Sequence, residues 1–152
     1  MQKWGPITWA LFHTMAEKIK NEKFNSHFPQ LWKHFTRICN SLPCPYCSEH
    51  ATTYLRRYKV TQFHNKQVFK KLIHQFHNEV NANTKKQPYN IDILETYKKE
   101  NLSQVFNNFI TEWNYQMNQK NMNLIAHNFI RKQTIKDFHL WFYSNLDIFD
   151  FS

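Results

Sequence analysis

The chain of 152 residues contains a single glycine, Gly5, where average usage of roughly 7% predicts about ten. The tight turns of β-hairpins depend on glycine, because it adopts positive φ without a steric penalty. An antiparallel β fold would therefore lack turn residues, and glycine-rich nucleotide-binding loops are excluded for the same reason. Hydrophobic residues make up 41% and charged residues 20% of the chain, as in globular proteins. The composition predicts an ordered all-α protein.

The formal charge of +9 is carried by the first hundred residues, which hold sixteen Lys and Arg against seven Asp and Glu. Residues 101–152 hold four of each and are neutral. A basic surface can serve nucleic acid, a membrane surface or an acidic partner, and charge alone does not choose between them. No apolar run approaches the roughly 18 residues of a membrane span, and the amino end lacks the apolar region of a secretory signal. We therefore expect no membrane span and no signal peptide.

Apolar residues recur at spacings of three and four along the chain, which predicts a four-helix bundle. Pro6, Pro29 and Pro45 stand at the expected starts of three helices, where a missing N–H group costs nothing. The first helix has apolar residues on two nearly opposite faces, so we expect neighbours on both sides. The four helices are expected at residues 7–19, 29–42, 44–58 and 65–83.

A short fifth helix is predicted at residues 91–99, with Asn90 as its N-cap. Helical spacing then continues to Trp113 and resumes after a polar link at 118–121. The change of charge near residue 100 is the only candidate boundary, so we expect a core at residues 1–99 and a helical extension at 100–152. The apolar residues of the extension are too many to leave in water, so it should pack on the core or on a partner subunit. They are Phe106, Phe109, Trp113, Phe129, Phe138, Trp141 and Phe142.

The three cysteines are Cys39, Cys44 and Cys47, and the last two form a Cys-Pro-Tyr-Cys motif at an expected helix start. Unpaired N–H groups and the helix dipole at that position favour a thiolate, which makes the sulfur nucleophilic. Cys39 falls on the apolar stripe of the preceding helix and is interpreted as a buried free thiol.

Two further interpretations of the cysteines are open at this point. A glutaredoxin-like enzyme carries the same motif, although its fold requires a β-strand where this chain has helical spacing. A zinc module would use Cys39, Cys44, Cys47 and His50, all permitted ligand types. With the basic charge, such a module would bind nucleic acid. The break at Pro43 separates its ligands, and no second cluster supports it.

Four motifs, in this order, resemble the Erv/ALR family of FAD-dependent sulfhydryl oxidases, in particular the short forms encoded by large DNA viruses. The WGPITW opening at residues 4–9, followed by His13, is similar to the start of the family domain. A proline-preceded CxxC follows at residues 43–47, and the family's HNxVN motif is matched in full at residues 77–81. A basic pair, Lys85 and Lys86, lies beyond it. The resemblance covers residues 4 to about 99.

The fourth expected helix carries a polar stripe that flanks its apolar face. At about 3.6 residues per turn, His74, His77, Asn78, Asn81 and Lys85 fall within about 100° of one another. A flavin dinucleotide needs such a wall, because its rings require apolar and aromatic surface and its polar edges require amides, imidazoles and cations. No metal is expected, and Tyr97 is the nearest candidate for the aromatic residue that family members place against the flavin. The residues expected at the cofactor are Gly5, Trp9, His13, His74, His77, Asn78, Val80, Asn81, Lys85 and Lys86.

The resemblance implies a thiol oxidase in which a substrate dithiol attacks Cys44, Cys47 passes two electrons to FAD, and O2 is reduced to H2O2. Since no second CxxC is present, electrons should come directly from a separate dithiol protein, such as a thioredoxin-like carrier. The resemblance also implies a homodimer formed through the first helices, and nucleic acid is not an expected partner. A viral origin would place the protein in the host cytoplasm or the virion, where it would oxidise virion proteins during assembly.

Overall fold

The computed structural model describes residues 3–118 and 125–152, and its regular structure is helical. The helices are α1 (Trp4–Lys18), α2 (Asn21–Asn40), α3 (Pro45–Leu55), α4 (Lys66–Asn83), α5 (Leu102–Met117) and α6 (Ile125–Ser144). Short 3₁₀ segments are η1 (Val60–Gln62), η2 (Ile91–Lys99) and η4 (Leu146–Ile148). Between the described residues, β pairing is limited to an isolated bridge that joins Ile19 and Phe149. The prediction of an all-α fold is confirmed.

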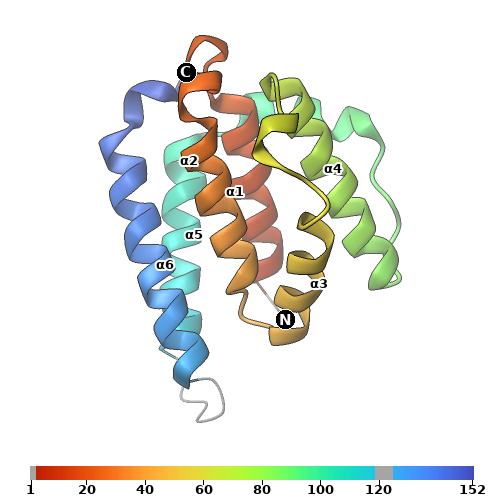
Figure 1. Ribbon diagram of the computed structural model, residues 1–152, viewed down its shortest axis with the longest axis vertical. Helices are drawn as coiled ribbons and strands as arrows, with labels where there is room; N and C mark the ends of the chain where they lie inside the picture. The colour runs from red at the N-terminus through yellow and green to blue at the C-terminus, as the bar shows by residue number, and fades with distance from the viewer. Residues whose placement is uncertain (1–2, 119–124) are drawn as a thin grey trace.

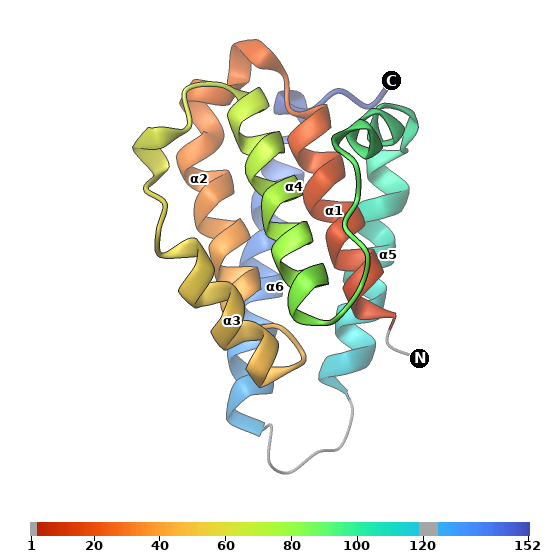
Figure 2. The same ribbon diagram turned by 90° about the vertical axis from the view of Figure 1, so that its right-hand side faces the viewer.

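Helices α1 and α2 lie in the middle of the molecule. Helices α3 and α4 lie on one side of them, and α5 and α6 lie on the other (Figure 1). Helix α1 packs on α4 and η2 and also on α5, so the prediction that it is covered on two faces is confirmed. The segment after α4 turns and runs back along α4 and α1 to η2 (Figure 2).

Helix α2 begins at Asn21, so the expected start near Pro29 is wrong and this proline lies inside the helix. A proline in a helix interior costs about 3 kcal/mol, because it removes a hydrogen bond and crowds the preceding turn. Phe24 and Phe28, each only 2% exposed, extend the buried stripe of the helix towards its start. Burial of two such rings, at about 1.5–3 kcal/mol each, offsets the cost of the proline.

Two other helix starts are set by N-cap residues, and one helix ends earlier than expected. Asn65 caps α4, because its side-chain oxygen accepts a hydrogen bond from the Val68 N–H at 3.1 Å, and α4 follows the predicted range closely. Helix α3 ends at Leu55, short of the expected Tyr58. Asn90 caps η2 as predicted by accepting from the Asp92 N–H at 2.9 Å. The segment it caps is a 3₁₀ helix whose side chains are at most partly buried, so burial does little to select α geometry.

Helices α5 and α6 pack on the core bundle in the same chain: α5 lies along α1, and α6 lies along α2 and α5. The Trp113 indole N–H donates to the Thr8 hydroxyl at 2.9 Å inside the α1–α5 interface. Phe129 is 73% exposed on the outer side of α6, so the expectation that it is covered is wrong for this residue. The expected link at 118–121 lies, apart from Asn118, outside the described residues.

Across the described part of the chain, no helix combines the length and the apolar character that crossing a membrane requires.

Candidate active site

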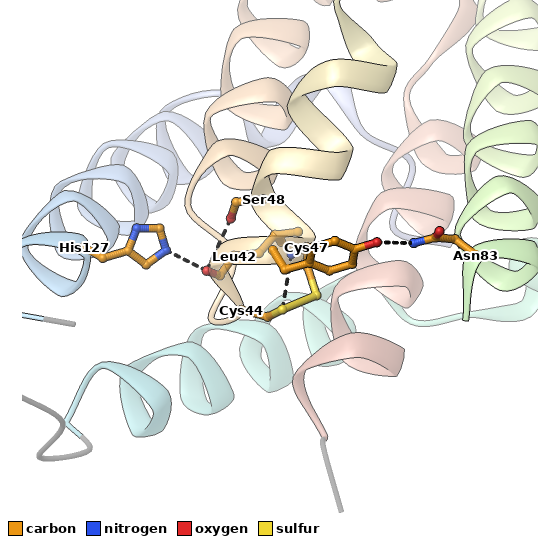
Figure 3. The surroundings of a disulfide bond; sticks show 7 residues. Leu42, Cys44, Cys47, Ser48, Asn83 and His127 are labelled. Atoms are coloured by element: carbon orange, nitrogen blue, oxygen red, sulfur yellow. Dashed lines mark hydrogen bonds between the residues drawn. A yellow bond between two sulfur atoms is a disulfide. The ribbon is translucent and has the colours of Figure 1, made fainter. Parts of the chain in front are cut away.

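The CxxC motif opens helix α3, where Cys44 is the N-cap residue and Pro45 occupies the first turn. Cys44 and Cys47 form a disulfide, with their Cα atoms 5.1 Å apart. The backbone N–H of Cys47 points at Cys44 Sγ over 3.2 Å (Figure 3). A donor in this position, together with the helix dipole, stabilises negative charge on Cys44 when the disulfide opens. The structure therefore has a disulfide between the two cysteines of the motif, at the helix start where the sequence analysis expects the motif.

Three side chains outside the CxxC motif itself hold the loop (Figure 3). The Leu42 carbonyl oxygen accepts hydrogen bonds from His127 Nε2 of α6 at 2.8 Å and from Ser48 Oγ of α3 at 3.4 Å. On the other side, Asn83 Nδ2 at the end of α4 donates to the Tyr46 hydroxyl at 3.2 Å. The loop is thus held between α4 and α6. Sequence reasoning missed His127 and Asn83, since a contact between distant segments leaves no local signal.

The two sides of the motif differ in accessibility. Tyr46, between the two cysteines, is 64% exposed, whereas Cys47 packs against the hydrophobic core. The loop is therefore open to solvent on the Tyr46 side. Cys39 is a buried free thiol, as predicted, and burial raises the pKa of its thiol well above the ordinary value. A neutral, enclosed thiol of this kind is not a nucleophile.

An aromatic wall joins α1, α4 and η2 at a second part of the site. Trp9 stacks on His77 with ring centroids 4.1 Å apart and planes within 8°. His13 Nε2 lies 3.0 Å from His77 Nδ1, and Tyr97 stacks on the His13 ring at 4.6 Å. We call Trp9, His13, His77 and Tyr97 the ring wall. His13 and His77 are 64 residues apart in the sequence, so this contact joins the opening motif of the chain to the HNxVN motif of α4.

Both imidazoles of the ring wall are neutral at physiological pH. Burial lowers the pKa of His13 to about 3, with further lowering from the nearby His77 and His74. Burial also lowers the pKa of His77 to about 4, and His74 and the Lys86 cation contribute. The contribution of Lys86 places a positive charge within electrostatic range of the ring wall. Within the described part of the chain, the buried His13 Nδ1 has no hydrogen-bond partner, so an unsatisfied polar atom lies next to the stacked rings.

The remaining polar residues of the α4 stripe hold the segment that follows α4. His74 Nε2 and Asn78 Nδ2 both donate to the Tyr89 carbonyl, at 2.9 and 3.0 Å. Asn78 Oδ1 also accepts from the Tyr89 N–H at 2.8 Å. Asn81 is buried, and its Nδ2 donates to the Gln87 carbonyl at 3.3 Å. These side chains act as clamps on the segment, a role that the sequence analysis did not anticipate.

The other expected cofactor residues differ in how they are placed. Lys85 and Lys86 are exposed beyond the end of α4, and Lys85 adopts the left-handed conformation with φ of 60°. Val80 packs against the core. Gly5 lies in the first turn of α1, and a Cβ built there would meet nothing within 4 Å. No close approach therefore requires glycine at this position. Sequence reasoning also missed Tyr89, whose ring lies 5.0 Å from that of His77.

The ligands proposed for a zinc module are not gathered in the structure. Cys39 is enclosed in the core, Cys44 is bonded to Cys47, and His50 Nε2 lies 3.8 Å from Glu79 Oε1. Among the residues that the structure describes, no three His, Cys, Asp or Glu side chains are grouped so that they could hold a metal ion. The glutaredoxin-like interpretation is wrong because a helix, α2, precedes the motif where that fold needs a strand.

Comparison with protein-family models gives a match to the Erv1 / Alr family over residues 6–101. The chain belongs to the Erv1/Alr family. Members of this family are generally sulfhydryl oxidases and typically bind FAD. The matched span contains the CxxC motif and the whole ring wall and ends at the start of α5. Comparisons with curated proteins and with solved structures give no match.

The residues present fit an FAD. Stacked, uncharged rings provide a surface for planar ring systems, and the unsatisfied His13 Nδ1 offers a polar partner in an otherwise apolar setting. Lys85 and Lys86 carry positive charge just beyond the end of α4, and Lys86 lies within electrostatic range of His77, so this end of the site could neutralise a pyrophosphate.

Proposed function

We propose that this protein is an FAD-linked thiol oxidase that introduces a disulfide into a protein dithiol. The observation that carries the proposal is the Cys44–Cys47 disulfide at the start of α3, in a chain that belongs to a family of sulfhydryl oxidases. The exposed Tyr46 side of the loop would receive the substrate, and the core side of Cys47 would face the electron acceptor.

The first steps use only thiol–disulfide exchange. A substrate thiolate attacks Cys44 Sγ, forming a mixed disulfide, while the Cys44–Cys47 bond breaks and Cys47 leaves as a thiolate. The second substrate thiolate then attacks the substrate sulfur of that mixed disulfide and displaces Cys44 as a thiolate. The substrate has lost two protons and two electrons, and the electron pair now resides on the cysteine pair. The Cys47 N–H, aimed at Cys44 Sγ, favours this second departure.

When bound, FAD would supply a two-electron acceptor for the reduced cysteine pair, and reoxidation of the flavin by O2 would yield H2O2. Trp9, His13, His77 and Tyr97 would hold its rings, and their neutral imidazoles place no fixed charge against them. Lys85 and Lys86 would bind its pyrophosphate. Asn78 and Asn81 would keep the segment after α4 in position beside it.

The proposal extends to partners and location. Since the chain has no second CxxC, a separate dithiol protein, such as a thioredoxin-like carrier, would deliver electrons directly. A homodimer stays a prediction from the family resemblance. Because α5 and α6 cover α1 and α2 in the same chain, a second copy would have to use another surface. A viral origin, with action in the host cytoplasm or the virion, also stays a prediction.

An absorption spectrum of the purified protein tests the proposal. We expect a yellow protein with about one FAD per chain, which consumes O2 and releases H2O2 when dithiothreitol is added. A colourless protein with stoichiometric zinc and affinity for nucleic acid would contradict it. A yellow protein that releases no H2O2 would be a flavoprotein without the proposed oxidase activity.

A further inference from the structure

The CxxC loop receives a hydrogen bond from outside the span matched by the Erv1/Alr family model. We propose that His127 of α6 is a positioning residue that holds the CxxC loop in the geometry that forms the disulfide, an inference that rests on the proposed function. His127 Nε2 lies 2.8 Å from the carbonyl oxygen of Leu42, two residues before Cys44 (Figure 3). The extension thus reaches the redox motif without supplying a group that reacts.

The nature of the acceptor determines that Nε2 of His127 carries a hydrogen in this contact. A carbonyl oxygen only accepts, so His127 must carry its proton on Nε2 and donate it. Ser48 Oγ donates to the same oxygen at 3.4 Å, near the limit of a hydrogen bond, whereas 2.8 Å is close to ideal. The contact with His127 is therefore the stronger of the two that fix this carbonyl.

Helix α6 gives the bond a rigid support. Arg37 of α2 donates to the Asp137 carboxylate at 2.9 Å, and the Trp141 indole N–H donates to Gln30 of α2 at 2.9 Å. The side chains of Ile135 and Phe138, beside these anchors, are buried and also hold α6 against the bundle. Because α2 leads directly into the CxxC loop, α6 and the loop are fixed to the same helix.

The hydrogen bond from His127 to the Leu42 carbonyl should restrict the loop more in the dithiol form than in the disulfide form. The disulfide itself restricts the loop covalently, whereas after reduction only non-covalent contacts keep the two sulfur atoms close. Loss of the His127 bond therefore releases more conformational freedom in the reduced protein and favours reduction. Loss of a hydrogen bond of ordinary strength would change the equilibrium constant for thiol–disulfide exchange between glutathione and the Cys44–Cys47 pair by about two- to tenfold.

A pair of polar substitutions isolates the bond. In His127→Gln the side-chain amide reaches the position of Nε2 and can still donate, whereas in His127→Asn it is one carbon shorter and falls short. His139→Asn is the control, because His139 lies on the same helix, is exposed and contacts Phe106 and Tyr143 away from the loop. The intact proteins are equilibrated without O2 in buffers of reduced and oxidised glutathione, then denatured, alkylated and weighed by mass spectrometry. Cys39 is alkylated in both forms and serves as an internal reference.

We expect His127→Asn to shift the equilibrium towards the dithiol by about two- to tenfold, and His127→Gln and His139→Asn to match the wild-type protein. Equal constants for all four proteins would overturn the inference. So would equal shifts in His127→Asn and His127→Gln, because they would assign the effect to the packing of the imidazole. This equilibrium requires neither flavin nor O2, so it is measured even if the wild-type protein lacks oxidase activity and the proposed function fails.

Discussion

His13 and His77 show how burial sets the chemistry of single residues in this site. Their pKa values of about 3 and about 4 lie well below the ordinary value of 6.5. In the unfolded chain both would take up a proton as the pH falls below about 6.5, while in the folded protein they stay neutral until about 4. The unfolded state therefore binds more protons between these limits, and folding stability decreases as the pH falls.

The pH dependence can be assigned to His13 by substitution. For each additional proton bound by the unfolded state, the free energy of unfolding falls by about 1.4 kcal/mol per pH unit. We expect urea titrations of the flavin-free protein to show a smaller loss of stability between pH 6 and pH 5 in His13→Gln than in the wild-type protein. Equal losses would show that His13 takes up its proton in the folded state.

Residue motifs were predictable from the sequence wherever their signal is local. The CxxC at a helix start and the polar stripe of α4 follow from spacing alone, and the structure has both. The family resemblance placed both Trp9 and His77 at the cofactor, but their stacking on each other was not predicted. His127 carried no signal at all, since its partner Leu42 lies 85 residues away. The clamp formed by Asn78 was equally hidden, because it depends on the path of the segment after α4.

At the scale of elements, the same limit appears at helix boundaries. Local rules place a helix start at Pro29, but burial of Phe24 and Phe28 extends α2 through it. The α helix predicted at 91–99 became the 3₁₀ segment η2, in which no side chain is buried. Propensity and capping therefore predicted the existence and order of the helices and the start of α4, whereas tertiary packing decided where α2 begins.

The α1–α5 contact provides a test at this scale. In Thr8→Val the Trp113 indole N–H loses its acceptor inside a buried interface, and an unsatisfied buried donor costs about 1–3 kcal/mol. We expect this loss in the free energy of unfolding, measured by urea titration. The same substitution at the exposed Thr53 of α3 should change stability by less than about 0.5 kcal/mol. Equal effects at the two positions would mean that the buried hydrogen bond contributes nothing to docking of α5.

At the scale of the whole molecule, the extension covers the faces of α1 and α2 that α3 and α4 leave open (Figure 1). A chain ending near Lys99 would lose Phe109 and Trp113, which are fully buried, and would expose their apolar partners on α1. We expect this shortened chain to aggregate or to change its oligomeric state, as measured by size-exclusion chromatography with light scattering. Any soluble fraction should keep FAD and part of its oxidase activity, because the ring wall and CxxC lie within residues 1–99. A well-behaved shortened chain with an unchanged oligomeric state would contradict the packing account.

The central claim is that electrons from a dithiol pass through the Cys44–Cys47 pair to a bound flavin. The most direct test is dithiothreitol-driven O2 consumption by purified Cys47→Ser protein, compared with Cys39→Ala, which alters the thiol that the structure encloses in the core. The account predicts that Cys47→Ser stays yellow and loses turnover, while Cys39→Ala keeps both colour and activity. A yellow Cys47→Ser protein that oxidises dithiothreitol at the wild-type rate would contradict it.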